Sequence, residues 1–509
     1  MNCKGFPGLN LCPGRKNQIY IFFFFLSIYA LTGQGSIQSS DGKIMYLLTR
    51  SLVEDHSLSF TEQVTLGDPE GEKYSKYGIG MSVLAIPFYL TGKLLAGILN
   101  IDAQYSTVFC VSMINALVTA LTCVLIYGFG RQRLGYGHRT AQMLALGFGL
   151  STIAWYYSED FMSEPATSLF LLASAFVISG NNADSRGRNL ILAGVLLGMA
   201  LTLRLATIVA LPGFLLYLIL ANPDARQRKW QAMIVDLSRF LVPVVFFIGL
   251  LFLYNYVRFQ NIFETGYERG FGANGLTGFL GILFSPGKSV FLYNPLLIMG
   301  CMAAAVFFRK QSAMAFLFGW IVLSHLLLFS FWHSWYGGMG WGPRLMLVTF
   351  PYLILPVGLL LERRERRAKT GVLVAIILGV LIQIPSVTVN IARYYYDLRL
   401  QYPDRAHDML LYSPAHSPLI GQVKEVAAVF NRLGDREFLD RLVAHAQAKT
   451  KFLGQSDREV LEKGLAINVP NFWWVFMRLF GYPVTLTFLP AIVLLSLVLF
   501  CGYKVYRDH

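Results

Sequence analysis

Residues 17–33, NQIYIFFFFLSIYALTG, decide the fold, because an apolar helix of about this length crosses the hydrocarbon core of a bilayer. A short polar segment, Ser39-Ser40-Asp41-Gly42-Lys43, follows this run. A second one, Ser75-Lys76-Tyr77-Gly78, precedes the next long apolar run. Charges so close to hydrocarbon are costly and are more often functional than accidental. The pattern predicts chemistry at a membrane surface, on a molecule that is half lipid and half water-soluble.

Composition places the whole chain in the membrane. The chain has 509 residues, of which 55% are hydrophobic and 14% charged, with a mean hydropathy of +0.51. Soluble domains contain about a quarter charged residues, and here long apolar stretches recur from end to end. We therefore expect an all-α polytopic membrane protein without a cleavable signal peptide. The net charge of +14 does not indicate nucleic acid, because the basic residues sit in short loops between apolar runs.

These basic loops also predict the topology. If all of them are cytoplasmic, consecutive clusters must be separated by an even number of spans. The run 79–99 breaks this rule, so we expect it to lie in the interface, which its Pro87 and Lys93 favour. The predicted spans are 17–33, 106–130, 140–157, 165–180, 189–203, 205–221, 238–257, 289–308, 312–331, 345–361, 370–390 and 484–503. This gives about twelve transmembrane helices, with both ends cytoplasmic.

Every sizeable loop then falls on the outer face, where we expect the chemistry. The predicted organisation has three parts: a transmembrane catalytic module (1–390) with a large first outer loop (34–105), an outer helical segment (391–483), and a last span with a cytoplasmic tail (484–509). The outer helical segment includes an amphipathic helix from Val423 to Ala446.

Acidic residues open two features of that face. Asp41 precedes a stretch, Lys43 to Val53, whose apolar spacing indicates an interfacial helix. Asp41 is equally consistent with a plain helix N-cap. The turn from Tyr156 to Glu164 brings Asp160 and Glu164 to the membrane edge, and Glu164-Pro165 opens the next helix. The helix dipole alone also favours acids there, so a structural role remains open.

Four basic residues belong to the same face. Arg204 lies among apolar residues near the tip of a tight hairpin, so it has to pair with an acid or bind an anion. Lys76 precedes the interfacial run, Lys288 begins a span, and Arg344 closes Trp341-Gly342-Pro343-Arg344. For Lys76 and Lys288, reaching up to the lipid headgroups is an equal alternative to ligand binding.

An aromatic loop lies between two of the later spans. His333, Trp335, Tyr336 and Trp341 alternate with glycines over residues 333–342. Such a loop suits a flexible platform for a sugar. An interfacial aromatic girdle explains the same residues equally well.

Taken in order, these motifs resemble the GT-C superfamily of membrane glycosyltransferases. Within it the chain is similar to protein O-mannosyltransferases and lipid A aminoarabinose transferases, over roughly residues 20–390. The motifs that carry the resemblance are Ser40-Asp41-Gly42 through Arg50, Lys76-Tyr77-Gly78-Ile79-Gly80, and Trp341-Gly342-Pro343-Arg344. The chain departs from the family at Gly42, where a second acid is common, and at Lys76-Tyr77-Gly78, where Lys-Pro-Pro or His-Pro-Pro is common.

The resemblance implies transfer of a sugar from a polyprenyl-phosphate donor to a glycan, lipid or protein acceptor, with inversion. It implies Asp41 as general base and Glu164 as a second catalytic acid that orients the acceptor or the sugar. The implied phosphate ligands are Lys76, Arg204, Arg344 and Lys288. The implied sugar or acceptor contacts are Asp160, His333, Trp335, Tyr336 and Trp341. Some members use a divalent metal, but no ligand cluster in this sequence demands one.

The resemblance also implies a location, the bacterial inner membrane with the site facing the periplasm. Two other functions fit an intramembrane charge pattern. One is a flippase or transporter of lipid-linked saccharides, and the other is an oligosaccharide ligase or polymerase. The polar features crowd one face instead of the midplane, and the halves of the chain show no repeat. We therefore expect a transferase.

Overall fold

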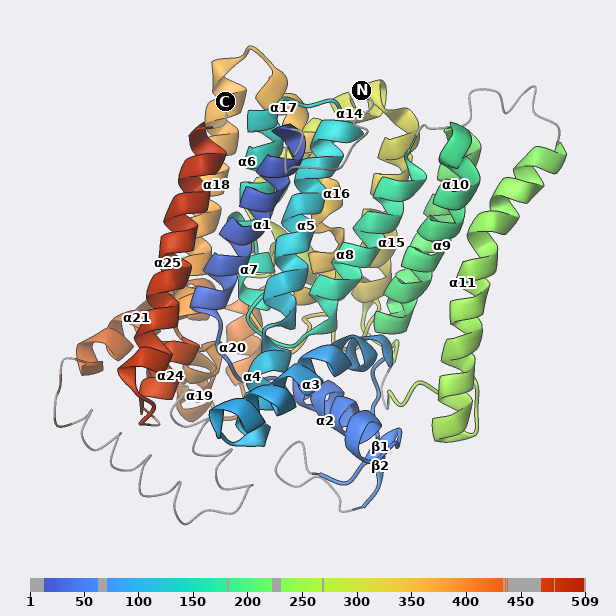
Figure 1. Ribbon diagram of the computed structural model, residues 1–509. Helices are drawn as coiled ribbons and strands as arrows, with labels where there is room; N and C mark the ends of the chain where they lie inside the picture. The colour runs from blue at the N-terminus through green and yellow to red at the C-terminus, as the bar shows by residue number, and fades with distance from the viewer. Residues whose placement is uncertain are drawn as a thin grey trace, which may run out of the picture.

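A computed structural model describes residues 13–62, 71–180, 183–221, 230–267, 270–433, 435, 437, 468–479 and 481–507. The molecule is a bundle of roughly parallel helices with a layer of shorter elements at one end (Figure 1). The helices of the bundle are α1 (Pro13–Thr32), α5 (Ile114–Gln132), α6 (His138–Ser151), α8 (Ser163–Ile178), α9 (Arg186–Leu203), α10 (Leu211–Leu220), α11 (Trp230–Phe259), α14 (Leu296–Lys310), α15 (Ser312–Ser330), α16 (Phe350–Ile354), α17 (Gly358–Glu362), α18 (Arg366–Thr388) and α25 (Val484–Arg507).

The remaining elements are shorter or lie outside the bundle. They are α2 (Ser40–Glu54), β1 (Ser59–Phe60), β2 (Lys73–Tyr74), α3 (Gly80–Leu99), α4 (Ala103–Ser112), α7 (Ala154–Tyr157), α12 (Gly275–Phe284), α13 (Val290–Tyr293), α19 (Ile391–Gln401), α20 (Ala406–Tyr412), α21 (Pro418–Leu433) and α24 (Trp473–Leu479). Short 3-10 turns are η1 (Ala183–Ser185), η2 (Leu205–Ala210), η3 (Arg344–Thr349), η4 (Leu355–Val357) and η5 (Pro414–His416). β1 and β2 pair antiparallel, with Ser59 opposite Tyr74.

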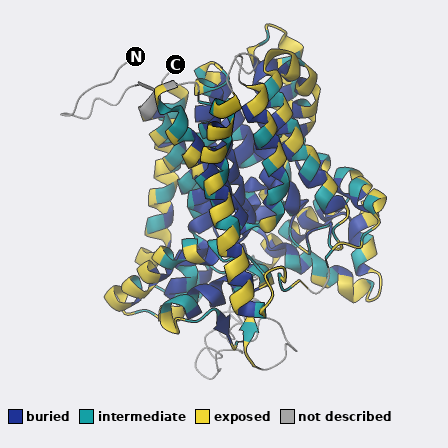
Figure 2. Ribbon diagram, turned by 90° about the vertical axis from the view of Figure 1, so that its right-hand side faces the viewer, coloured by how far each residue is buried: buried dark blue, intermediate teal, exposed yellow. Residues whose placement is uncertain are grey.

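The bundle has the burial pattern of a membrane protein. Exposed residues follow the outward faces of the helices, and buried ones fill the centre (Figure 2). Large apolar side chains such as Val242, Phe246 and Leu253 of α11 are exposed along the edge of the bundle. The segment Arg344–Glu362 runs through the interior and is almost entirely buried. Exposed apolar surface of this extent fits contact with lipid.

By length and composition, eight helices in the described part of the chain are able to cross a membrane. The all-α membrane fold is therefore confirmed, while the number of twelve spans stays a prediction. Several bundle helices, among them α6 and α8, are shorter than the about 20 residues that cross a bilayer core upright. The first turn of α1 and the last turn of α25 lie at the same end of the bundle, as expected for an even number of crossings (Figure 1).

The segment expected to lie in the interface does not follow the bundle axis. α3 is long and apolar enough to span, yet Figure 1 shows it lying across the lower end of the bundle beside α2 and α4. Its C-terminus is Asn100, which adopts the left-handed conformation that ends a helix. Within segment 391–483 the structure describes α19, α20, η5, α21 and α24. Much of that segment, including residues 438–467, lies outside the described residues, and so does part of the helix expected from Val423 to Ala446.

Candidate active site

α2 places Asp41 at the end of the bundle where the shorter elements lie (Figure 1). Ser39 is the N-cap of this helix, and its hydroxyl oxygen accepts a hydrogen bond from the Gly42 amide at 3.2 Å. Asp41 therefore lies in the first turn, and the alternative that it serves as the cap is wrong. Met45, Tyr46 and Leu47 on the same helix are buried in one apolar cluster with residues of α3 and hold α2 in place. The carboxylate of Asp41 does not cap the helix.

Asp41 begins a chain of alternating charges, here called the ionic cluster: Asp41, Arg344, Glu164 and Arg204. Asp41 Oδ2 accepts a hydrogen bond from Arg344 Nη2 at 2.7 Å. Arg344 Nη1 lies 3.8 Å from Glu164 Oε1, which in turn lies 2.6 Å from Arg204 Nη1. Glu164 is 1% exposed. Residues from four separate regions of the chain thus meet at one end of the bundle.

Local structure explains how the two arginines reach this cluster. Arg204 ends α9 with extended backbone, and η2 and α10 then return across the bundle, which is the hairpin expected from the sequence. Arg344 begins η3 directly after Pro343, which cannot donate a backbone hydrogen bond and suits the start of a helix. Glu164 lies in the first turn of α8, where the helix dipole favours a negative charge.

The segment from Lys76 to Gly80 packs directly on the break after α9. A Cβ atom on Gly78 would fall far inside contact distance of the Thr202 carbonyl oxygen, and one on Gly80 would lie 2.5 Å from Thr202 Oγ1. Both glycines are therefore required for this close approach. Arg258, at the end of α11, donates a hydrogen bond to the Ser75 carbonyl from the other side. The backbone beside Lys76 is thus fixed next to Arg204.

We expect Gly78→Ala to separate these two segments. The added methyl group cannot be accommodated without moving backbone, which is typical of overpacking that costs about 1–3 kcal/mol. The variant should unfold at a lower temperature in detergent than the parent protein. Gly249→Ala on α11 is the matched control, because a Cβ there meets nothing within 4 Å. Equal melting temperatures for the two variants would contradict the close contact.

Electrostatics at Asp41 are dominated by its neighbours. Burial alone would raise the pKa of Asp41, but the Arg344 charge and hydrogen bonds from Tyr77 and Arg344 outweigh it, and the pKa falls to about 2. The charge of Lys76 acts in the same direction. Lys76 itself is exposed, with its Nζ 5.6 Å and 5.9 Å from the ring centres of Tyr77 and Tyr267. Asp41 is therefore an anion at neutral pH.

Two further acids lie in the turn before α8. Burial raises the pKa of Asp160 to about 6, with a further contribution from the Asp41 charge, against hydrogen bonds from Ser39 and from the Phe161 amide. Burial also raises the pKa of Glu159 well above its ordinary value, and the nearby Asp160 charge acts in the same direction. Asp160 thus lies beside the ionic cluster, although its side chain is enclosed. Its expected role in sugar or acceptor binding stays a prediction.

Lys288 does not join the ionic cluster. It is 2% exposed, and its Nζ donates hydrogen bonds to the carbonyl oxygens of Gly338 and Gly340, at 2.8 and 2.5 Å. Both the expected phosphate contact and the alternative contact with headgroups need an accessible ammonium group. The prediction that Lys288 binds the donor phosphate is corrected, because its ammonium group is buried and already hydrogen-bonded to two carbonyl oxygens.

The expected aromatic platform is also corrected in part. Trp341 is 1% exposed, and its indole nitrogen donates to Gln383 Oε1 at 2.9 Å, so it belongs to the core. Trp335 is buried against Gly281. Tyr336 is half-buried, with its ring centre 4.5 Å from that of His407, and His333 is exposed. Of the four residues, these last two keep surface that a ligand is able to reach.

Sequence reasoning missed two tyrosines beside Asp41. Tyr77 donates a hydrogen bond to Asp41, and this hydrogen bond contributes to the raised pKa of the Tyr77 hydroxyl, after burial and the Asp41 charge. Tyr267, on the loop between α11 and α12, lies near the charges of Arg204, Asp41, Arg344 and Glu164. Tyr77 was available as a polar group within the Lys76 motif. For Tyr267 the sequence offers no signal except its place in a loop that is expected to face outward.

The described part of the chain contains no cluster of metal-ligating side chains. No group of three or more His, Cys, Asp or Glu side chains there is arranged to hold an ion. The donors at the cluster are also in contact with arginines, which disfavours a second cation. The ionic cluster therefore does not fit a metal, and no step is assigned to one.

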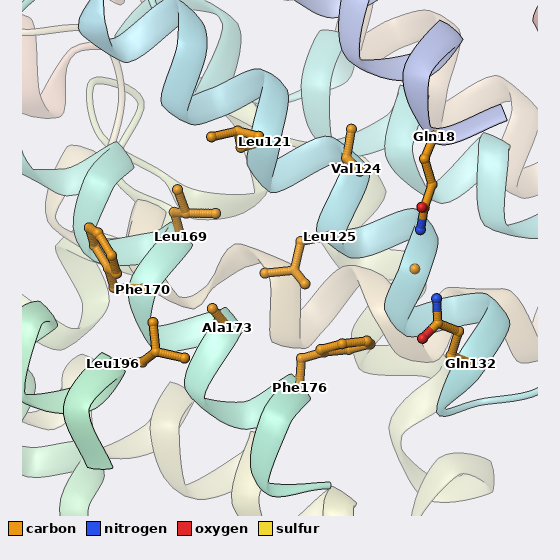
Figure 3. A pocket seen from close by; sticks show the side chains of 11 residues that line it. Gln18, Leu121, Val124, Leu125, Gln132, Leu169, Phe170, Ala173, Phe176 and Leu196 are labelled. Carbon is orange, nitrogen blue, oxygen red and sulfur yellow. The ribbon is translucent and has the colours of Figure 1, made fainter. Parts of the chain in front are cut away.

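One cavity lies away from the ionic cluster, within the helix bundle. Its volume is ≈ 420 Å³, and it opens between α1, α5, α8 and α9 (Figure 3). Leucine and phenylalanine side chains line most of it, and the amides of Gln18 and Gln132 point toward each other at one end. It contains none of the candidate site residues.

Part of the chain is similar in sequence to a known protein family. Residues 75–253, roughly a third of the chain, match the sequence profile of a family described as dolichyl-phosphate-mannose-protein mannosyltransferase. The match includes Lys76, Asp160, Glu164 and Arg204. The resemblance to membrane glycosyltransferases of the GT-C superfamily is confirmed by this match over those residues. A comparison with curated proteins finds no match.

Solved structures with a similar arrangement share little sequence with the chain. ArnT from Cupriavidus metallidurans, solved with bound undecaprenyl phosphate, is 14% identical, with a TM-score of 0.45 over 88% of this chain and 74% of that chain. The oligosaccharyltransferase AglB from Archaeoglobus fulgidus, in complex with an inhibitory peptide and a dolichol-phosphate, is 10% identical, with a TM-score of 0.46 over 80% and 60%. An oligosaccharyltransferase of the same organism in the apo form is 12% identical, with a TM-score of 0.45 over 89% and 69%.

Proposed function

We propose that this chain transfers a sugar from a polyprenyl-phosphate donor to an acceptor hydroxyl at the outer face of a bacterial inner membrane. The observation that carries the proposal is the ionic cluster, in which Asp41 contacts Arg344 and Glu164 contacts both arginines at one end of the bundle. The family match over residues 75–253 supports a glycosyltransferase. The sugar and the acceptor are left open within this class.

The cationic groups suit a single lipid phosphate. Lys76 is exposed beside the cluster, with its Nζ near the rings of Tyr77 and Tyr267, so its ammonium group is accessible to an incoming phosphate. Arg344 and Arg204 lie behind it and are able to donate charge-assisted hydrogen bonds to phosphate oxygens. Three cations stabilise the negative charge that grows on the phosphate as it leaves.

The low pKa of Asp41 sets an order of events. A general base works best when its pKa is near the operating pH, and a carboxylate with a pKa of about 2 is a weak base. Arg344 is the main neighbour that lowers this pKa. When a donor phosphate accepts hydrogen bonds from Arg344, it takes part of that charge from Asp41, and the basicity of the carboxylate rises. We therefore propose that the donor binds before the acceptor is deprotonated.

The reaction then balances with the groups present. The acceptor oxygen forms a bond to the anomeric carbon, and its proton passes to Asp41. The bond from the anomeric carbon to the phosphate oxygen breaks, and the electron pair leaves with polyprenyl phosphate. Attack opposite the leaving phosphate inverts the anomeric centre. Glu164 holds Arg204 and Arg344 in place, which positions the phosphate for this attack.

A direct assay tests the proposal. Purified protein in nanodiscs is incubated with a panel of polyprenyl-phosphate sugars and with glycan, lipid and peptide acceptors. We expect release of polyprenyl phosphate from one donor and a matching mass increase of one acceptor. The same protein in vesicles should not move a fluorescent lipid-linked sugar between leaflets. Translocation without release of polyprenyl phosphate would replace the transferase by a flippase.

A further inference from the structure

Lys288 is a buried lysine whose position the proposed reaction does not explain. It lies in the turn 285–289 between α12 and α13 and is 2% exposed. In the described part of the chain, no carboxylate lies within ion-pair distance of its Nζ. Burial, together with the nearby Arg344 charge, lowers the pKa of Lys288 to about 7. Burying an ammonium group costs free energy, and its hydrogen bonds offset part of that cost.

Both hydrogen bonds of Lys288 end on one loop. Its Nζ donates hydrogen bonds to the carbonyl oxygens of Gly338 and Gly340. The Tyr157 hydroxyl donates one to the Trp341 carbonyl at 2.9 Å. Gly337 and Gly338 have φ values of +69° and +76°, in the left-handed region that favours glycine. Successive glycines give a loop little stiffness of its own. The hydrogen bonds from Lys288 and Tyr157 therefore fix the backbone conformation of this loop.

The same loop forms a wall against Arg344. A Cβ atom on Gly337 would lie 2.9 Å from Arg344 Cγ and 3.3 Å from its Nε, so the loop backbone is in close contact with this side chain. The far end of that side chain contacts Asp41 at 2.7 Å. A shift of the loop therefore moves the guanidinium group relative to Asp41.

The turn that carries Lys288 is itself anchored to the outer helical segment. The Ser285 hydroxyl and the Gly287 amide donate hydrogen bonds to the Leu411 carbonyl of α20. The Ser417 hydroxyl donates to the Pro286 carbonyl at 2.6 Å. Lys288 thus connects a fixed turn to a flexible glycine loop.

We propose that Lys288 is a positioning residue that acts through Arg344. Its ammonium group ties the loop 337–340 to the turn 285–289, and this loop holds the Arg344 side chain beside Asp41. Lys288 touches neither donor nor acceptor. The kinetic part of this inference rests on the proposed transferase function, whereas the structural part does not.

The structural part is tested by labelling the loop. The Gly337 amide is buried and donates a hydrogen bond to the Ser334 carbonyl at 2.9 Å, so its hydrogen exchanges with deuterium only when the loop opens. We expect Lys288→Met to speed deuterium labelling of the peptide that contains Gly337 by tenfold or more, which corresponds to about 1.4 kcal/mol in the free energy of loop opening. Lys93→Met, which breaks the exposed ion pair with Glu54, is the control and should leave the rate unchanged. Equal labelling rates in all three proteins would overturn the tether.

The kinetic part is tested by a double-mutant cycle with Arg344. With the donor found in the assay above, Lys288→Met should lower kcat/KM by about tenfold or more in the Arg344 background, and by less than about twofold in the Arg344→Gln background. The same relative loss in both backgrounds would assign Lys288 a general structural role and overturn the inference. If Lys288→Met does not fold, Lys288→Gln, which keeps one donor, carries both tests. Fast labelling in a protein without transferase activity would refute the proposed function and leave the tether standing.

Discussion

Asp41→Asn is expected to lower turnover by about 10²- to 10⁴-fold, the usual contribution of general-base catalysis. Asparagine has the same shape as aspartate and is able to accept the hydrogen bond from Arg344, but it cannot take a proton from the acceptor. Ser39 caps α2, so the helix does not depend on the charge of Asp41. We expect release of polyprenyl phosphate to fall. The melting temperature should also fall at neutral pH, because the lowered pKa of Asp41 means that its negative charge stabilises the fold there.

Asp102→Asn is the matched control for this change. Asp102 is an acid at the same end of the molecule, and it caps α4 through the amides of Gln104 and Tyr105. Asparagine caps a helix as well as aspartate does, so this variant should keep full activity. An Asp41→Asn protein that is folded and turns over at the parent rate would refute the role of Asp41 as base.

Arg204→Met is expected to cost both stability and donor affinity. Glu164 is buried and lies 2.6 Å from Arg204 but 3.8 Å from Arg344, so the substitution removes its main partner. Breaking a buried ion pair on one side costs about 3–5 kcal/mol, because the other charge stays buried. The variant should melt at a clearly lower temperature, and adding Glu164→Gln should recover much of the loss. Arg204→Lys should keep part of the donor affinity, because lysine lacks the bidentate fork.

Arg186→Met on α9 separates this effect from the general loss of an arginine. Arg186 lies 2.9 Å from Asp236, at a more exposed position, and Asp236 keeps a second arginine, Arg239, at 3.9 Å. An exposed pair of this kind contributes at most about 1 kcal/mol. If both variants melt together, or if Glu164→Gln restores nothing, the buried pair is not what stabilises this end of the bundle.

Sequence alone predicts the features that depend on polarity and period. The basic loops separate the spans, and one arginine among apolar residues marks the hairpin tip at Arg204. The same reasoning set apart the run that became α3, because its charge and proline suit an interface better than a crossing. Asp41, Glu164, Arg204 and Arg344 were each selected singly, as charges at the membrane edge.

What the sequence could not give is the direction of side chains in loops. Trp341 and Tyr336 look alike in an aromatic stretch, yet Trp341 turns inward to Gln383 and Tyr336 stays half-exposed. Lys288 likewise turns to carbonyl groups that lie some fifty residues away in the chain. The pairing of Asp41 with Arg344 spans 303 positions, and no local pattern records a contact of that separation.

The ion pairs of Arg344 and Arg204 also affect how other phosphate-bearing lipids would compete for this site. Under the proposed function, headgroup phosphates of ordinary phospholipids compete with the carrier lipid for the site, and unpaired arginines would attract them. Here such a phosphate has to separate Arg344 from Asp41 and then leaves the carboxylate without a partner. A carrier lipid that brings a sugar and recruits an acceptor hydroxyl gives Asp41 a new hydrogen bond. Under the proposed function, the site therefore selects against ordinary phospholipids because binding one of them costs the Asp41–Arg344 ion pair without replacing it.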